Sequence, residues 1–130
     1  MNSISNCAKP WVIIAALLGA SAVLAGAFGA HGLKAILTPA QLVTWKMASF
    51  YQLVHAVLLM ALAASALIEL KSFRLASKVL LLGIVLFSGS LYLLLLIGIK
   101  FLAILTPIGG VLLVAGWLLL AFAALRNKNI

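Results

Sequence analysis

The side chains of this sequence that are able to do chemistry are few, and most of them lie inside long apolar runs. Gln52 and His55 are three residues apart, which places them on one face of a helix. Ser88 and Tyr92, four residues apart, share a face in the same way. A serine beside a histidine is the start of a nucleophile and base pair, but the apolar runs contain no Asp or Glu to orient the ring. We therefore predict that the protein is not an enzyme and holds no cofactor and no metal ion.

The apolar runs that carry these residues are long enough to cross a bilayer. The chain has 130 residues, of which 67% are hydrophobic and 8% charged, and its mean hydropathy is +1.35. A hydrocarbon core of about 30 Å needs roughly 20 apolar residues per helix, and four such runs occupy 11–30, 47–68, 79–99 and 101–125. We predict one all-α membrane domain over residues 1–130, an antiparallel bundle of four transmembrane helices at about 11–31, 39–69, 78–99 and 101–126.

The basic residues cluster at the ends of these helices. Six lie on the side shared by both termini and the middle connection, namely Lys9, Lys71, Arg74, Lys78, Arg126 and Lys128. Three lie on the other side, namely Lys34, Lys46 and Lys100. This asymmetry predicts that both termini are cytoplasmic. The net charge of +8 thus indicates topology and not nucleic-acid binding, and the expected partner is the lipid bilayer.

The first apolar run also has features of a secretory signal. Lys9 precedes it, and Ala25-Gly26-Ala27 has the small-x-small pattern of a cleavage site. Cleavage there would leave three spans and put the termini on opposite sides, so we predict that the first helix is retained. Cys7 is the single cysteine and is expected to be a free thiol in a short tail.

Local signals predict how the first helix ends and the second begins. Thr38, Pro39 and Gln41 have the spacing of a capping box with proline at the first helical position. Trp45 then lies near the membrane boundary, where we expect it to be an interfacial anchor. Gly32 is expected to end the first helix in a left-handed turn.

Small residues form two adjacent ridges on the first helix. Ser21, Ala25 and Gly29 recur every four residues, and the second ridge of Ala22, Gly26 and Ala30 lies beside them. Such ridges let another backbone approach closely, and close contact holds membrane helices together. The residues predicted to serve helix packing are Ser21, Ala22, Ala25, Gly26, Gly29, Gly89, Gly109 and Gly110.

The polar side chains of the other helices fall in the half of the membrane opposite the termini. Counting inward from the lysines of that side at about 1.5 Å per residue places them about 9 to 18 Å deep. We expect one polar cluster between the helices, formed by His31, Gln52, His55, Ser88, Tyr92 and Thr106. His31 would lie near its mouth, and His55 would be neutral and bonded to Tyr92 or to a carbonyl freed around Pro107. Ser90 is expected to bond back to the Leu86 carbonyl.

Four blocks of the sequence resemble a known family. "GAFGAHGL" at 26–33, "FSGSLY" at 87–92, "TPIGG" at 106–110 and "AGW" at 115–117 are similar to the signature blocks of the YgdD-like small inner-membrane proteins. These proteins form the family of domain of unknown function 423 and are related to transmembrane protein 256. The resemblance implies a four-helix protein of the bacterial inner (plasma) membrane, and it supplies no activity, substrate or cofactor. Its motif positions here are Gly26, Gly29, His31, Ser88, Gly89, Ser90, Tyr92, Thr106, Pro107 and Gly110.

Two functional hypotheses follow. The first is a non-enzymatic structural or accessory component, either a homo-oligomer or a subunit docked on a membrane protein partner through the Gly/Ala-rich face. The small soluble area and the lack of catalytic groups favour it. The alternative is a carrier or binder of a small or lipid-like molecule at the polar cluster around His55, which the Pro-Gly-Gly break in the fourth helix favours.

Overall fold

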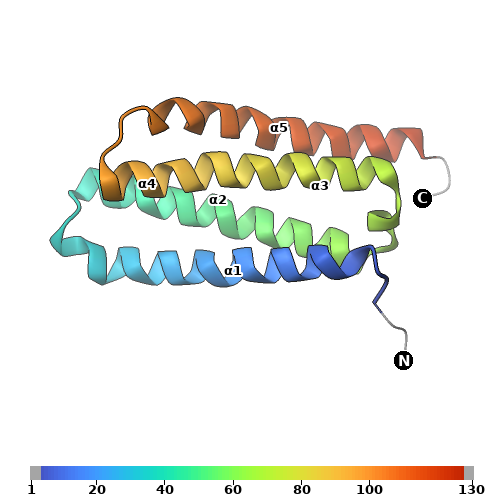
Figure 1. Cartoon of the computed structure of the whole chain (residues 1–130), viewed down its shortest axis with the longest axis horizontal. Coiled ribbons are helices and arrows are strands. Elements are labelled where there is room, and N and C mark those ends of the chain that lie inside the picture. The colour runs from blue at the N-terminus through green and yellow to red at the C-terminus, as the bar shows by residue number, and fades with distance from the viewer. Residues whose placement is uncertain (1–3, 128–130) are drawn as a thin grey trace.

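The computed structural model describes residues 4–127, which form four long helical segments running antiparallel (Figure 1). The segments are α1 (Ala8–Ala30), α2 (Pro39–Ala64), the continuous run of α3 (Lys71–Ile84), a π-helical turn η3 (Val85–Gly89) and α4 (Ser90–Ile97), and finally α5 (Leu102–Arg126). Two short 3-10 turns, η1 (Gly32–Ala35) and η2 (Ala66–Glu69), lie in the connections. All four segments are long and apolar enough to span a membrane, so the predicted all-α membrane fold is confirmed.

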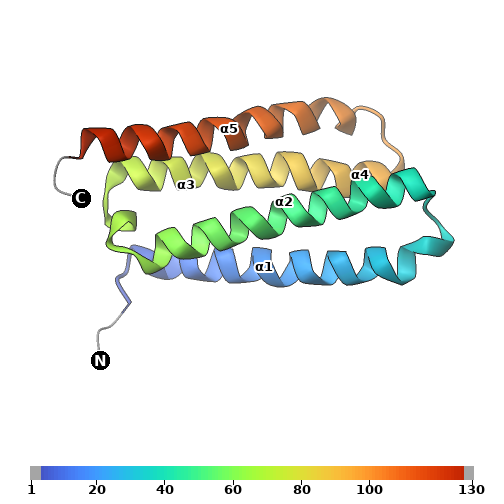
Figure 2. The same ribbon diagram turned by 180° about the vertical axis from the view of Figure 1, so that it is seen from behind.

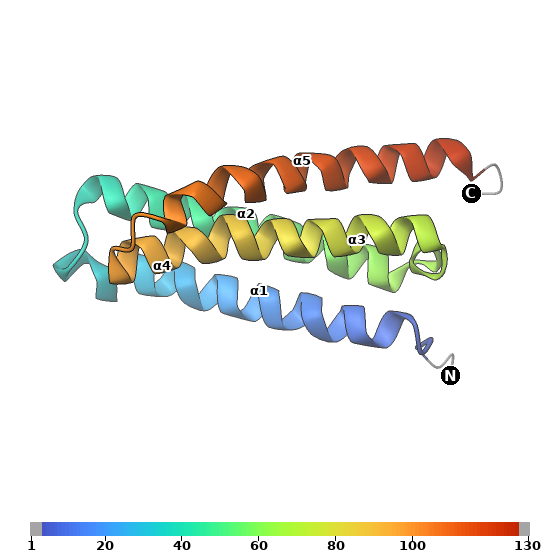
Figure 3. The same cartoon turned by 45° about the horizontal axis from the view of Figure 1, so that its top comes forward.

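α1 and α5 lie on opposite sides of the bundle, and α2 and the α3–α4 run lie between them (Figures 1, 2 and 3). The tightest pairs are α1 with α2 and α3 with α5, and α2 joins the two hairpins through α3, η3 and α4. Of the spanning residues, 44% are buried in α2 but only 17% in α1 and 22% in α5. α1 and α5 therefore present most of their apolar surface to the bilayer.

Both ends of the described chain lie at one end of the bundle, beside the η2 connection (Figure 1). Five of the six basic residues assigned to this side from the sequence are found at that end: Lys9, Lys71, Arg74, Lys78 and Arg126. Lys128 lies outside the described residues. The opposite end carries η1 and the tight turn between α4 and α5.

The start of α2 has the predicted capping box. The Thr38 hydroxyl accepts a hydrogen bond from the Gln41 amide at 3.3 Å, and the Gln41 side-chain oxygen accepts one from the Thr38 amide at 2.8 Å. Pro39 occupies the first helical position, where no amide hydrogen is needed. These contacts fix where α2 begins.

Trp45 is not an interfacial anchor, and that prediction was wrong. Its side chain is buried with 6% of its surface exposed, and its indole nitrogen donates to the Ala25 carbonyl at 2.7 Å. The ring rests on Gly29, where an added Cβ would lie 2.5 Å from the indole Cδ1. Because Gly29 has no side chain, the indole fits between α1 and α2 instead of facing lipid headgroups.

The left-handed glycine is Gly98 and not Gly32. Among residues 4–127, Gly98 is the glycine with a positive φ, at 70°, and it ends α4 before the turn into α5. At the end of α1 the chain leaves the helix at His31 and enters η1 directly. A 3-10 turn takes up the end of the helix there, so no left-handed residue is required.

The second connection differs from the predicted helix bounds of 39–69 and 78–99. Ser65 is extended, and its hydroxyl donates to the Leu62 carbonyl at 2.9 Å and accepts from the Leu67 amide at 3.3 Å. These bonds end α2 at Ala64, and η2 follows. The third segment begins at Lys71 because its first two turns are amphipathic, with Phe73 and Ser77 buried. Apolar runs alone do not reveal such turns.

The N-terminal segment docks against this connection. Ser5 Oγ donates to Glu69 Oε1, and the Arg74 guanidinium donates to the carbonyls of Ile68 at 3.1 Å and Glu69 at 2.6 Å. The same guanidinium nitrogen lies 3.2 Å from Cys7 Sγ. Cys7 is a free thiol, as expected, but it is half-buried in this contact rather than in a solvated tail.

Glycines make the closest helix contacts. An added Cβ on Gly109 of α5 would lie 2.7 Å from the Phe87 Cα, so the two backbones are in direct contact. In the interface of α3 and α5, an added Cβ on Gly83 would lie 2.8 Å from Leu113 Cδ2. An added Cβ on Gly116 would lie 2.5 Å from Leu80 Cδ2. Gly109 and Gly116 are seven residues apart and so share one helix face. The sequence interpretation missed the contacts of Gly83 and Gly116, and this spacing was an available signal for Gly116.

The small ridges of α1 pack against α2 within the chain. Ala22 and Gly29 are buried, and Ala25, Gly26 and Ala30 are half-buried. Gly26 lies beside Ser49, with 3.9 Å from an added Cβ to the hydroxyl. Most of this small-residue surface is therefore already occupied by α2, whereas Ser21 is exposed.

Candidate functional site

Gln52 connects three helices. It lies on α2 with 6% of its surface exposed. Its side-chain nitrogen donates to the Leu18 carbonyl at 2.9 Å and to Ser21 Oγ at 2.7 Å, both on α1. Its side-chain oxygen accepts from the Tyr92 hydroxyl of α4 at 2.9 Å. Both amide hydrogens and the carbonyl oxygen of Gln52 are thus engaged in contacts between helices.

A groove lies above this network, between α1 and the run from α3 to α4, and has a volume of about 400 Å³. Its lining is mostly apolar, with one polar patch of Ser21, Gln52 and Tyr92. Gly89 also lines it, and an added Cβ there would meet nothing within 4 Å. Gly89 therefore differs from the packing role expected for it, because its missing side chain leaves the groove open instead of admitting another helix.

His55 joins α2 to α5. It is 4% exposed, its Nε2 accepts from the Trp117 indole nitrogen at 3.2 Å, and its Nδ1 lies 2.7 Å from the Tyr51 carbonyl. An indole nitrogen only donates and a carbonyl only accepts, so both contacts are satisfied by the neutral ring with its proton on Nδ1. His55 is hydrogen-bonded as expected, but its partners are Trp117 and Tyr51 rather than Tyr92 or a carbonyl near Pro107.

The hydroxyl groups near the middle of the membrane bind carbonyls and one another. Ser88 is 1% exposed and donates to the Ala48 carbonyl of α2 at 2.8 Å. Ser90 bonds to the Phe87 carbonyl at 3.0 Å and not to that of Leu86, and it shares a hydrogen bond of 2.7 Å with Thr106 of α5. Ser21 and Ser49 also bond to the carbonyl three residues back within regular α-helices, so this reach does not depend on the π-helical turn.

The six residues expected to form one cluster are therefore distributed over separate contacts. Gln52 and Tyr92 are bonded to each other, whereas His55, Ser88 and Thr106 each bond to a different partner. His31 is exposed at the end of α1, and its ring takes part in none of the hydrogen bonds found among residues 4–127. A similar depth along the helices did not reveal on which face of its helix each side chain lies.

Two partners in these contacts were missed as site residues. Ser21 was assigned to packing alone, although a hydroxyl inside an apolar run was itself a signal for a hydrogen bond. Trp117 belongs to the "AGW" block, but its contact joins residues 62 positions apart, and no local spacing predicts that.

The arrangement leaves little for catalysis. No buried side-chain nitrogen or oxygen within residues 4–127 lacks a hydrogen-bond partner. The lone pair of His55 Nε2 is occupied by Trp117, and the sequence has a single acidic side chain, Glu69, at the end of the bundle. Among residues 4–127, these contacts do not bring together a nucleophile, a free base and an orienting acid.

The family model described as "Protein of unknown function (DUF423)" matches residues 25–110. The chain belongs to this family. The recognition based on the four sequence blocks is thereby confirmed, and the family carries no assigned function. The matched part includes Gln52, His55, Ser88 and Tyr92, whereas Trp117 lies beyond it.

Relatives from several bacteria are similar to nearly the whole chain. A UPF0382 membrane protein of Staphylococcus epidermidis, SERP0230, is 41% identical over 91% of this chain and 97% of its own length. A UPF0382 membrane protein of Haemophilus influenzae is 40% identical over 92% and 97% of the two chains, and YwdK of Bacillus subtilis is 38% identical over 91% and 98%. No solved structure matches the chain. The names of these relatives confirm the membrane assignment.

Proposed function

We propose that this protein is a non-enzymatic structural or accessory component of the bacterial inner membrane. The observation that carries this proposal is that buried polar side chains within the spans are engaged in hydrogen bonds, several of which join two helices. Contacts of this kind contribute about 0.6 kcal/mol each in membrane proteins. They serve to hold the four helical segments in one arrangement.

The orientation with both termini in the cytoplasm belongs to the same proposal. It is supported by the excess of lysine and arginine at the end of the bundle that carries Ala8 and Arg126. A second copy or a membrane protein partner would meet the outer faces of α1 or α5, because most of the small-residue surface of α1 is covered by α2.

The experiment replaces the central hydrogen-bonded pair by apolar groups of similar shape. A deletion strain is complemented with the Gln52→Leu/Tyr92→Phe variant, expressed to the same folded level as the wild type. A structural role predicts a less stable protein that still returns the deletion strain to wild-type behaviour. A folded variant that fails to return the deletion strain to wild-type behaviour would instead show that these polar groups act on a ligand.

The groove over Gln52 favours a second candidate, a carrier or binder of a lipid-like molecule. It is open to the side, apolar along most of its lining, and polar at one place, which suits an amphiphilic guest. Gly89→Leu would place a large side chain at the groove, and its Cβ would meet nothing within 4 Å. If the groove binds a lipid-like molecule, mass spectrometry of the purified variant should lack a compound present in the wild type, and Gly89→Ala should retain more of it.

A further inference from the structure

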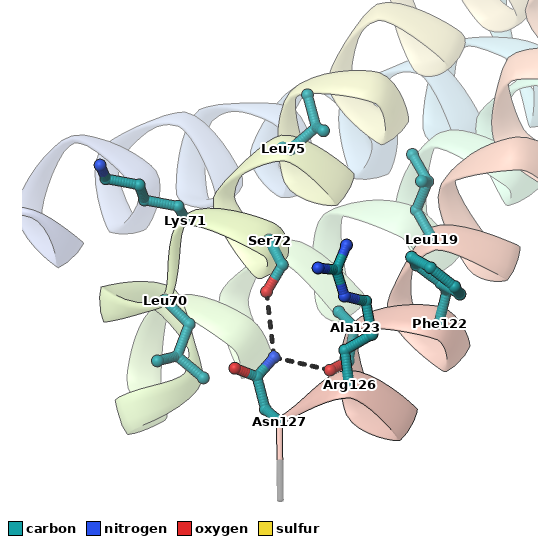
Figure 4. A pocket seen from close by; sticks show the side chains of 9 residues that line it. All are labelled: Leu70, Lys71, Ser72, Leu75, Leu119, Phe122, Ala123, Arg126 and Asn127. Carbon is teal, nitrogen blue, oxygen red and sulfur yellow. Dashed lines mark hydrogen bonds between the residues drawn. The ribbon is translucent and has the colours of Figure 1, made fainter.

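A cavity of about 470 Å³ lies between the start of α3 and the end of α5, at the end of the bundle that carries both termini (Figure 4). Lys71, Ser72 and Arg126 line its polar part, and Leu75, Leu119 and Phe122 line its apolar part. The Arg126 side chain extends from α5 toward α3 (Figure 4). The cavity is distinct from the groove over Gln52, which shares none of these residues.

The lining is ordered along the direction in which the helices cross the membrane. Leu75 follows Lys71 by four residues, and Leu119 precedes Arg126 by seven. At about 1.5 Å per residue, these leucines lie about 6 and 10 Å deeper than the charged residues of their helices. The cations are thus at the membrane boundary and the apolar side chains extend inward, which is the order of groups in a phospholipid.

The walls of the cavity are fixed by contacts within the chain. Asn127 Nδ2 donates to Ser72 Oγ at 3.2 Å and to the Ala123 carbonyl at 2.6 Å, which joins the end of α5 to the start of α3. The Arg126 guanidinium lies 5.5 Å from the centroid of the Phe122 ring, a cation–π distance. The positive charge is therefore held at the rim.

The sequence cannot neutralise these cations with its own acidic side chains. It has nine lysines and arginines but one acidic side chain, Glu69, whose Oε1 accepts a hydrogen bond from Ser5. Arg74 is engaged by the carbonyls of Ile68 and Glu69. Lys71 and Arg126 therefore form a cationic rim above an apolar cavity.

We propose that this cavity binds an anionic phospholipid, with the headgroup at Lys71 and Arg126 and an acyl chain along Leu75 and Leu119. Charge complementarity selects the anionic headgroup, and the apolar depth selects a lipid over a soluble phosphate. Each cation near an anionic lipid surface contributes about a fivefold gain in affinity, so the pair accounts for roughly 25-fold.

The test uses the full chain in mild detergent, with native mass spectrometry of bound dioleoyl phosphatidylglycerol and dioleoyl phosphatidylcholine. Lys71→Gln/Arg126→Gln should weaken phosphatidylglycerol binding about 25-fold, since two cations are lost. The matched control, Lys34→Gln/Lys46→Gln, removes the same charge at the opposite end and should change binding less than twofold. Phosphatidylcholine should bind weakly to all three proteins.

A third variant separates the cavity from its charges. Leu119→Trp keeps both cations and fills the apolar part, so it should also weaken phosphatidylglycerol binding. Circular dichroism and thermal unfolding check that each variant is folded. Equal losses from the two charge pairs, equal binding of both lipids to the wild type, or unchanged binding by folded Leu119→Trp would each overturn the proposal.

Discussion

Two adjacent glycines on α5 should respond to the same substitution with opposite signs. An added Cβ on Gly109 lies 2.7 Å from the Phe87 Cα, whereas one on Gly110 lies 3.8 Å from the Phe87 ring, at ordinary contact distance. Phe87 presents its backbone to Gly109, and a backbone atom cannot turn aside as the end of a side chain can. Gly109→Ala should therefore force α5 away from η3 or distort one of them.

The expected magnitudes follow from this geometry. Overpacking of a tight interface costs about 1 to 3 kcal/mol, and moving α5 would also loosen the contact of Gly116 with Leu80. Gly110→Ala brings no clash, and replacing glycine inside a helix gains roughly 0.5 to 1 kcal/mol. The two variants should thus differ by about 1.5 to 4 kcal/mol in the free energy of unfolding.

The assay is unfolding of both variants and the wild type in the same detergent, by denaturant titration or thermal shift. Gly109→Ala should unfold more readily than the wild type, and Gly110→Ala at least as late as the wild type. If both variants had the same stability, the backbone contact between α5 and η3 would be absent, and the packing described for the second hairpin would be refuted.

Further predictions concern the first hairpin, chain processing and the histidine. Gly29→Leu should unfold or misassemble the protein, because a Cβ there would lie 2.5 Å from Trp45 Cδ1. The control Leu17→Phe, at a 66% exposed position, should have a mild effect in a thermal-shift assay. Equal effects of the two variants would contradict this packing. Intact-mass measurement should find α1 present, and a reporter at the C-terminus should be cytoplasmic. Trp117→Phe should cost about 0.6 kcal/mol, the usual value of one hydrogen bond between membrane helices, and should change the ¹⁵N shift of His55 Nε2; an unchanged shift would contradict the bond.

The fold was largely predictable from the sequence because its main signals are local. Each apolar run is long enough to span a bilayer by itself, and the capping box at Thr38 lies within four residues. The errors arose where a local rule competed with tertiary contact. Trp45 has the sequence position of a boundary anchor, but the space over Gly29 and the carbonyl of Ala25 make burial the better solution.

The candidate site was less predictable because its contacts join distant parts of the chain. Depth along a helix placed Gln52 and Tyr92 at similar levels, and they do meet. The same argument placed His55 with them, although it faces α5 on another side of α2 and bonds to Trp117. Helix rotation, which decides these pairings, is set by packing between helices and is not encoded in the depth of a residue.

The central claim is that the buried polar groups hold the helices together. It is tested most directly by a double-mutant cycle on Gln52 and Tyr92, with unfolding free energies measured for Gln52→Leu, Tyr92→Phe and the double variant in one detergent. The hydrogen bond of 2.9 Å between them predicts a coupling free energy of about 0.6 kcal/mol, with about 1.7 as the upper range. A coupling free energy of zero would show that the two side chains do not stabilise each other and would contradict the claim.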